Sequence, residues 1–220
     1  MRHSFAFVAV AATSSLASAQ VVFSNNFEGA MPAEITGAGS IQGSQGYSGW
    51  GFGNNLLRND AGGNPATATT LTLTGLGAHT SISIDCLLAV IDSWDSDNGN
   101  PSPDYFNIAV DGSPVFQATF AHASGGNNYN LGQLVYNTQL GFNGSWGDSA
   151  YDLSFEPSLH NIAHTGSTLT ITFFASGGGW QAGDDESWGI DNLTVTLVPT
   201  PGAATLLLAG APLAMRRRRS

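Results

Sequence analysis

Four aspartates crowd one short stretch of the sequence, residues 92–104, which reads DSWDSDNGNPSPD. Crowded carboxylates repel one another unless a cation lies between them, and calcium prefers oxygen ligands of this kind. Asp92, Asp95, Asp97 and Asp104 therefore predict either a calcium-binding loop or an open, solvated acidic loop. The stretch does not fit the helix-flanked pattern D-x-[DN]-x-[DN]-G, because the glycine falls at the fifth position counted from Asp95.

A second acidic stretch, GDDESWG, carries Asp184, Asp185 and Glu186 and is a further candidate for metal binding. The two stretches are predicted to form separate candidate sites.

Aromatic residues in glycine-rich stretches could form platforms on which sugar rings stack. The stretch QGYSGWGFGNN spaces three of them through glycines. The candidates for a carbohydrate platform are Tyr47, Trp50, Phe52 and Trp94, and Trp146 and Trp180 lie in similar surroundings. Packing in the core remains the alternative for these rings, and Trp188, beside the last apolar stretch, is expected in the core.

Signatures of catalysis are missing from the sequence. It contains neither a G-x-S-x-G nucleophile elbow nor the E-x-D-x-x-E strand motif of β-glucanases. His160 and His164 have a spacing of four residues, but SLHNIAHTGS is a connection bounded by Gly and Ser, not a helix that would align them as zinc ligands. We therefore expect a protein that is not an enzyme.

Charge and cysteine content narrow the class of protein further. The chain has six arginines, no lysine and sixteen acidic residues, and residues 20–198 hold one arginine and all the acids, a formal charge of −15. Nucleic acid is excluded as a partner, because phosphate contacts need Lys and Arg. Cys86 is the single cysteine, so no disulfide staples the chain, and its place on an apolar strand face predicts a buried thiol.

The first nineteen residues have the pattern of a secretory signal peptide. A single Arg2 precedes an apolar stretch, and the small residues ASA end at position 19, which predicts cleavage before Gln20.

The last residues, 198–220, read VPTPGAATLLLAGAPLAMRRRRS. The apolar segment is shorter than the ~20 residues of a spanning helix and contains a proline. With Pro199 and Pro201 before it and Arg216, Arg217, Arg218 and Arg219 after it, the tail resembles the PEP-CTERM sorting signal of exported bacterial proteins. The resemblance implies transient retention at the inner membrane, cleavage by an exosortase-type enzyme, and release or attachment at the cell surface. Thr200 stands where the family name has Glu. A basic tail without this function is the alternative.

Between these termini, residues 20–197 predict a single all-β domain. Stretches such as TTLTLTGLG, TSISIDCLLAVIDSW and STLTITFFASG alternate apolar and polar residues between turn-forming clusters. DYFNIAVDG followed by SPVFQATFA predicts a hairpin with a turn at Asp111-Gly112. The number of short strands and the size of the domain favour a two-sheet antiparallel jelly-roll sandwich.

Two short motifs, Asn26-Phe27-Glu28 near the start and Ile190-Asp191-Asn192 in the last apolar stretch, resemble those of jelly-roll carbohydrate-binding modules and related lectin-like and adhesion domains. The resemblance implies that the first and last strands lie side by side and that Glu28 and Asp191 hold a structural calcium ion. Without a metal, both acids would cap strand ends or accept hydrogen bonds from backbone amides.

The sequence thus predicts an exported β-sandwich, stabilised by calcium, with a structural or adhesive role at the cell surface or in the extracellular matrix. The alternative is a calcium-dependent carbohydrate-binding module whose partner is an extracellular polysaccharide. A polysaccharide-active enzyme is the least favoured reading.

Overall fold

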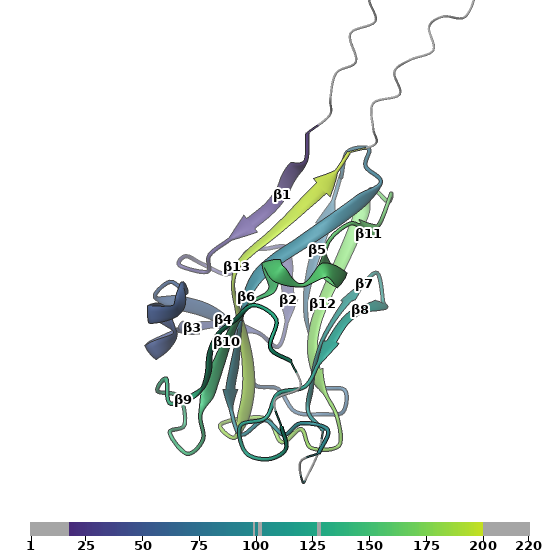
Figure 1. Cartoon of the computed structure of the whole chain (residues 1–220). Helices are drawn as coiled ribbons and strands as arrows, with labels where there is room; N and C mark the ends of the chain where they lie inside the picture. The colour runs from purple at the N-terminus through teal and green to yellow at the C-terminus, as the bar shows by residue number, and fades with distance from the viewer. Residues whose placement is uncertain (1–17, 99, 101–102, 127–128, 200–220) are drawn as a thin grey trace, which may run out of the picture.

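The computed structural model describes residues 18–98, 100, 103–126 and 129–199 as two antiparallel β-sheets packed face to face (Figure 1). This is the all-β jelly-roll sandwich predicted from the sequence. Most of the predicted signal peptide and all but the first two residues of the predicted sorting tail lie outside the described residues. Within the described residues, no helix is long and apolar enough to cross a membrane.

The larger sheet has eight strands. They are β1 (Gln20–Asn25), β3 (Ser40–Gly43), β4 (Asn55–Asn59), β6 (Ser81–Asp92), β9 (Gln133–Thr138), β10 (Asp148–Asp152), β11 (Ile162–Ala163) and β13 (Glu186–Val198). The smaller sheet has five strands. They are β2 (Ile35–Gly37), β5 (Thr69–Thr74), β7 (Tyr105–Val110), β8 (Ser113–Ala118) and β12 (Thr168–Ser176). Three short 3-10 helices, η1 (Gln45–Trp50), η2 (Leu153–Phe155) and η3 (Pro157–Leu159), lie in the connections.

The long antiparallel pair of β6 and β13 forms the centre of the larger sheet, whose order is β3-β4-β13-β6-β10-β9. β1 pairs with the end of β13, from Leu193 to Leu197, whereas β4 pairs with its beginning, from Trp188 to Ile190. The first and last strands therefore lie side by side, as the two motifs predicted. The smaller sheet has the order β2-β5-β12-β7-β8.

Alternation of side chains explains why these segments form strands around one core. In β5, Leu71 and Leu73 face inward while the threonines between them face outward. In β6, alternate residues from Ile82 to Val90 are buried against the smaller sheet. Cys86 belongs to this row and is buried, as predicted, and burial raises the pKa of its thiol. Trp188 is also buried in this core, as expected.

The predicted hairpin between β7 and β8 is confirmed. Asp111 and Gly112 have φ angles of +48° and +78°, the left-handed pair that a two-residue type I′ turn requires. The Asp111 carboxylate accepts a hydrogen bond from the backbone N–H of Thr170 at 2.8 Å, which ties the turn to β12.

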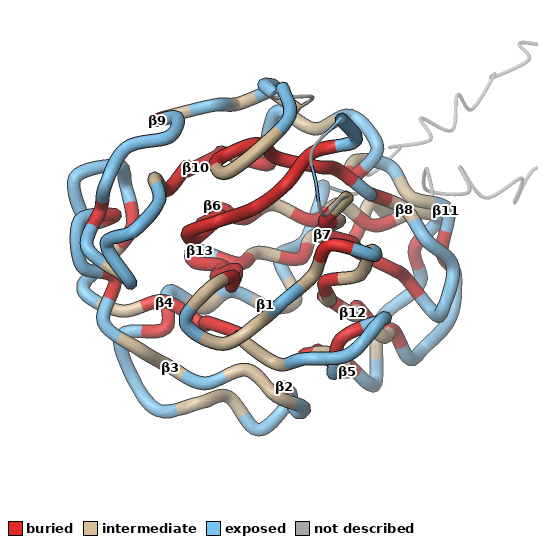
Figure 2. The backbone as a smooth tube through the Cα atoms, turned by 90° about the horizontal axis from the view of Figure 1, so that it is seen from below, coloured by how far each residue is buried: buried red, intermediate tan, exposed pale blue. Residues whose placement is uncertain are grey.

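A second, smaller core covers the outer face of the larger sheet. Its buried residues are Tyr47, Phe52, Leu56, Ala89, Ile91, Val135, Leu140 and Ala150. Since Ala89 and Ile91 face this core while Leu88 and Val90 face the main one, β6 is covered on both sides. Figure 2 shows β6 near the centre of the molecule with exposed loops around it, and the strand is buried without interruption from Leu88 to Asp92.

Two acids, Glu28 just after β1 and Asp191 in β13, hold the chain where it enters β4. The buried Asp191 accepts hydrogen bonds from Gly53 N at 2.8 Å and Asn192 N at 2.6 Å, at an irregularity in the pairing of β13. Glu28 accepts one from Asn55 N at 2.9 Å. Burial raises the pKa of Asp191, and the charge of Glu28 raises it further.

We expect Asp191→Asn to lower the free energy of unfolding by about 2 kcal/mol in the presence of EGTA, because the neutral amide cannot accept both backbone bonds. Urea unfolding followed by tryptophan fluorescence measures this loss. A calcium ion held by Glu28 and Asp191, as the sequence resemblance implies, makes the loss larger in calcium than in EGTA. If the free energy of unfolding falls equally in the two buffers, Glu28 and Asp191 do not hold a calcium ion.

A neutral histidine lies inside the loop that follows β8. Since the backbone oxygen of Asp92 can only accept, His122 donates to it from Nδ1 at 2.6 Å, and its Nε2 accepts from the hydroxyl of Ser149 at 2.7 Å. Burial lowers the pKa of His122 to about 4.

The share of the stability that His122 contributes should therefore fall in mildly acidic solution. The unfolded histidine binds a proton below its ordinary pKa of 6.5, whereas the folded one does so only near 4. The contribution of His122 is thus present above pH 6.5 and is lost as the pH falls, by about 2 kcal/mol between pH 7 and pH 5. Urea unfolding at both pH values, compared with His122→Gln, measures it. A variant with the same pH dependence as the native chain would refute the assignment.

Candidate functional site

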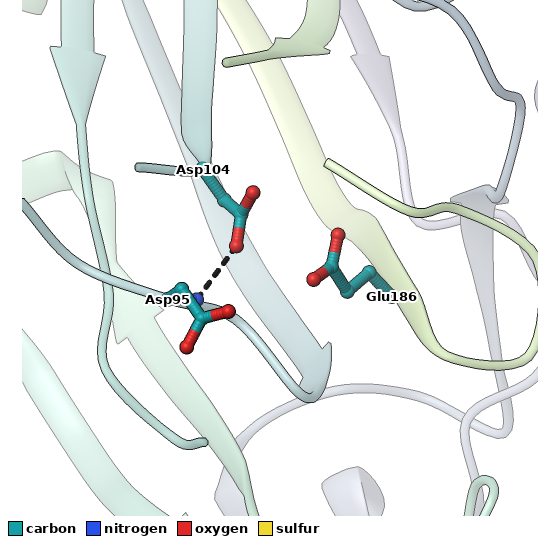
Figure 3. Close-up of side chains that lie close together, drawn as sticks. All are labelled: Asp95, Asp104 and Glu186. Atoms are coloured by element: carbon teal, nitrogen blue, oxygen red, sulfur yellow. Dashed lines mark hydrogen bonds between the residues drawn. The ribbon is translucent and has the colours of Figure 1, made fainter. Parts of the chain in front are cut away.

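Three acidic side chains meet at the end of the sandwich opposite the described chain ends (Figures 1 and 3). Asp95 lies in the loop after β6, Asp104 directly precedes β7, and Glu186 is the first residue of β13. One carboxylate oxygen from each lies within 4.8 Å of the others. All three are buried, with exposed fractions of 2%, 0% and 0%. We refer to Asp95, Asp104 and Glu186 as the acidic triad.

Backbone amides hold the triad in place. Asp95 N donates to Asp104 Oδ2 at 2.6 Å, the bond drawn in Figure 3, and Asp104 N donates to Asp95 O at 2.9 Å. Gln181 N donates to Glu186 Oε2 at 2.6 Å, and the Ser124 hydroxyl donates to Asp95 Oδ1. Asp104 Oδ1 is buried and has no hydrogen-bond partner among the described residues.

The charge of the triad is not balanced by a basic side chain. Arg58 is the one Lys or Arg in the described part of the chain. It donates instead to Ser187 Oγ at 2.9 Å, Gln42 Oε1 at 3.1 Å and Gly183 O at 3.1 Å. Burial raises the pKa of both Asp104 and Glu186, and the proximity of the two carboxylates raises that of Glu186 further.

A hollow of about 320 Å³ opens beside the triad. It is lined by Ser93, Asp95, Asn100, Ala123, Ser124, Trp146, Gln181 and Asp185. Asp95 belongs to both the triad and the hollow, and Gln181 connects the two through its bond to Glu186. Trp146 is 44% exposed, so part of its ring is open to a ligand, while the remaining lining is mostly polar.

Asp92 supports the loop that carries Trp146. Trp146 N donates to Asp92 Oδ1 at 3.1 Å, and Gln139 Nε2 donates to Trp146 O at 2.6 Å. Asp148 in turn accepts from Asp92 N at 3.0 Å. Burial raises the pKa of Asp92 to about 6. The backbone of Trp146 is therefore held by hydrogen bonds that lead back to Asp92 at the end of the central strand β6.

The predicted acidic loop is thus divided between several surroundings. Asp95 and Asp104 come together, but Asp92 is directed to the Trp146 loop. Asp97 is exposed and accepts from the Tyr105 hydroxyl at 3.1 Å. Glu186, from the second acidic stretch, takes the third place, because β13 pairs with β6 in a register that sets Glu186 opposite Asp92. The separation of the two acidic stretches into independent sites was wrong, and only this long-range pairing reveals it.

The expectation that Tyr47, Phe52 and Trp94 form accessible platforms is wrong, since all three are buried. The Tyr47 hydroxyl donates to Val90 O at 2.8 Å, and Trp94 Nε1 donates to Ser187 O at 2.9 Å. Of the four leading candidates, Trp50 alone is exposed, at 39%. Trp146, whose loop-like surroundings the sequence did show, lines the hollow beside the triad.

The two histidines considered as a zinc pair do not face each other. His164 Nδ1 lies 2.6 Å from Nε2 of His79, and the two rings stack. His160 Nε2 lies 3.7 Å from an oxygen of Asp85. Each histidine therefore has a different partner, as expected for a connection that is not a helix.

Comparisons with known proteins find similar folds but no family. No family model and no curated protein matches the chain. The xylan-binding CBM22-1 domain of Paenibacillus barcinonensis Xyn10C is 12% identical, with a TM-score of 0.42, covering 84% of this chain and 99% of that domain.

Two other solved structures show similar values. A family 35 carbohydrate-binding module from an environmental isolate has 12% identity, a TM-score of 0.38, and coverage of 82% and 100%. The K2 cleaved adhesin domain of Lys-gingipain has 16% identity, a TM-score of 0.40, and coverage of 80% and 97%. Because all these TM-scores lie below 0.5, function is argued below from the geometry of the site itself.

Proposed function

We propose that the chain is a non-catalytic module that binds a glycan in the hollow beside Trp146. The observation that carries this proposal is the exposed Trp146 ring at a hollow lined by amide, hydroxyl and carboxylate groups. A sugar has both an apolar face of C–H groups and a rim of hydroxyls. The ring of Trp146 can stack on the C–H face, and the polar side chains of Asn100, Gln181 and Ser93 can form hydrogen bonds with the hydroxyls.

The size of the hollow favours a short segment of glycan. A volume of about 320 Å³ lies at the small end of the range for ligand sites in proteins. The site is open on one side, since Asn100, Trp146 and Gln181 are all exposed. A polymer could therefore continue beyond the hollow while one part of it is held against Trp146.

Charge favours a neutral glycan over an acidic one. Asp95 and Asp185 line the hollow, and residues 20–198 carry a formal charge of −15. A uronic acid or a sulfated sugar would be repelled both by these two carboxylates and by the field of the whole domain. Neutral polysaccharides are accordingly the first ligands to test.

This function fits the location predicted from the sequence. A module exported by residues 1–19 and sorted by residues 198–220 would meet polysaccharide at the cell surface or in the extracellular matrix. Glycan binding would also provide the attachment that an adhesive role requires. Export, the exosortase-type processing and the adhesive role stay predictions from the sequence.

We expect the full chain to be retarded in affinity gel electrophoresis by at least one neutral polysaccharide, and Trp146→Ala to weaken this binding about tenfold. The reason is the loss of the stacking surface, worth roughly 1–1.5 kcal/mol. Trp50→Ala is the matched control, because Trp50 is similarly exposed but does not line the hollow. Equal weakening by both substitutions, or no retardation by any neutral glycan tested, would contradict the proposal.

A further inference from the structure

We propose that the acidic triad binds one calcium ion, and that this ion holds the lining of the hollow in its glycan-binding arrangement. The second part rests on the function proposed above, whereas the first stands on the triad alone. The ligand set joins Asp95 and Asp104, which lie in the connection between β6 and β7, with Glu186 at the start of β13.

The first argument is charge balance. Three buried carboxylates lie within 4.8 Å of one another, and Arg58, the one Lys or Arg among residues 18–199, makes its hydrogen bonds elsewhere. Buried charges in proteins are paired, protonated or bound to metal. No basic side chain from the described part of the chain is placed to pair with this triad, so a proton or a cation must do so.

The second argument is an oxygen without a partner. Asp104 Oδ1 belongs to a fully buried side chain and accepts no hydrogen bond from any N–H or hydroxyl group of the described residues, although the other oxygen of the same carboxylate accepts from Asp95 N. The carboxyl group of Glu186 can donate to Asp104 only when Glu186 is protonated. The neighbouring Ser96 hydroxyl is also buried without a partner. A buried acceptor left unpaired is costly, and a metal ion would satisfy it.

The donor set selects the kind of ion. The three ligands all offer carboxylate oxygens, with neither the histidine nitrogen nor the cysteine sulfur that zinc sites use. Oxygens bound to a common calcium ion at 2.3–2.6 Å lie no more than about 5 Å apart, which the triad satisfies. Calcium needs six to eight ligands, and water entering through the hollow that Asp95 lines would complete the set.

The same carboxylates hold the walls of the hollow. Asp95 accepts from the Ser124 hydroxyl, which itself accepts from Asn100 N at 2.8 Å, and Glu186 accepts from Gln181 N. Three separate segments of the lining are therefore attached to the triad. With neither an ion nor a shared proton between them, the carboxylates would repel one another and push these segments apart.

Calorimetric titration of the full chain with calcium chloride tests the metal site without any glycan. We expect the number of calcium equivalents bound to fall by one in Asp104→Asn and in Glu186→Gln, relative to the native chain. Asp97→Asn is the matched control, because Asp97 lies in the same loop but is exposed and bonded to Tyr105. Identical calcium binding by the native chain and both triad variants, or no calcium binding at all, would overturn the proposal.

Thermal melts in EGTA separate this result from a folding defect. Both substitutions keep the size of the side chain, so the midpoint in EGTA should lie close to that of the native chain. In saturating calcium the native chain should melt several degrees above both variants, because only the native chain binds the ion at this site. As a measurement that needs no variant, terbium emission excited through tryptophan should appear in the native chain and be displaced by calcium. Absence of this emission would also count against the site.

Affinity electrophoresis in calcium and in EGTA tests the link to glycan binding. We expect at least tenfold weaker retardation in EGTA for the native chain, with no change on chelation for Glu186→Gln. Calcium binding without any glycan binding would refute the proposed function and leave the metal site standing. Equal glycan binding in calcium and EGTA, by a chain that binds calcium, would refute the second part of the inference.

Discussion

The constraint on which this structure depends is negative charge buried with almost no positive charge to meet it. The chain has sixteen acids and no lysine, and Arg58 is the one basic residue of the domain apart from histidines. Several acids are satisfied by backbone N–H groups instead: Asp191 fastens Gly53, Asp148 fastens Leu140, and Glu28 fastens Asn55. These carboxylates hold irregular loops against the sheets through hydrogen bonds to the backbone. In other exported domains disulfides have this role. In the acidic triad, backbone N–H groups do not satisfy every buried carboxylate oxygen, since Asp104 Oδ1 accepts from none of them.

The pairing of β6 with β13 links this electrostatic problem to the proposed ligand site. Both strands are long and buried, so their ends are fixed relative to each other. The end of β6 leads into the loop that carries Asp95, and the beginning of β13 supplies Glu186. The same end of β6 places Asp92, which supports the backbone of Trp146. The buried ring of Trp94, from the same loop after β6, makes an edge-to-face contact with Trp180 at 5.2 Å between ring centres. A rigid central ladder thus positions both the triad and the aromatic ring.

Local patterns in the sequence sufficed for the strands but not for the site. The alternation in TTLTLT and the Asp-Gly turn act over a few residues, so β5 and the β7–β8 hairpin were predictable. The two terminal motifs also indicated correctly that β1 and β13 are neighbours. The sequence indicated that Asp95 and Asp104 lie close together, because both belong to one acidic stretch. It did not indicate Glu186, which comes near them through the pairing of β6 with the distant strand β13. Exposure of rings was the least predictable property. The glycines around Tyr47 and Phe52 indicate a tight turn, yet that turn folds back onto the outer face of the larger sheet and buries both rings in a second core.

The central claim is that a cation, and not a shared proton, balances the buried acidic triad. A crystal structure determined from the full chain grown in calcium chloride tests it most directly. The account predicts a single strong peak of electron density bounded by Asp95, Asp104 and Glu186, with metal–oxygen distances of about 2.3–2.6 Å, including one to Asp104 Oδ1. A direct hydrogen bond between the carboxyl groups of Asp104 and Glu186, with no density for an ion between the three side chains, would contradict it. In that case a shared proton, not a metal, would balance the charge.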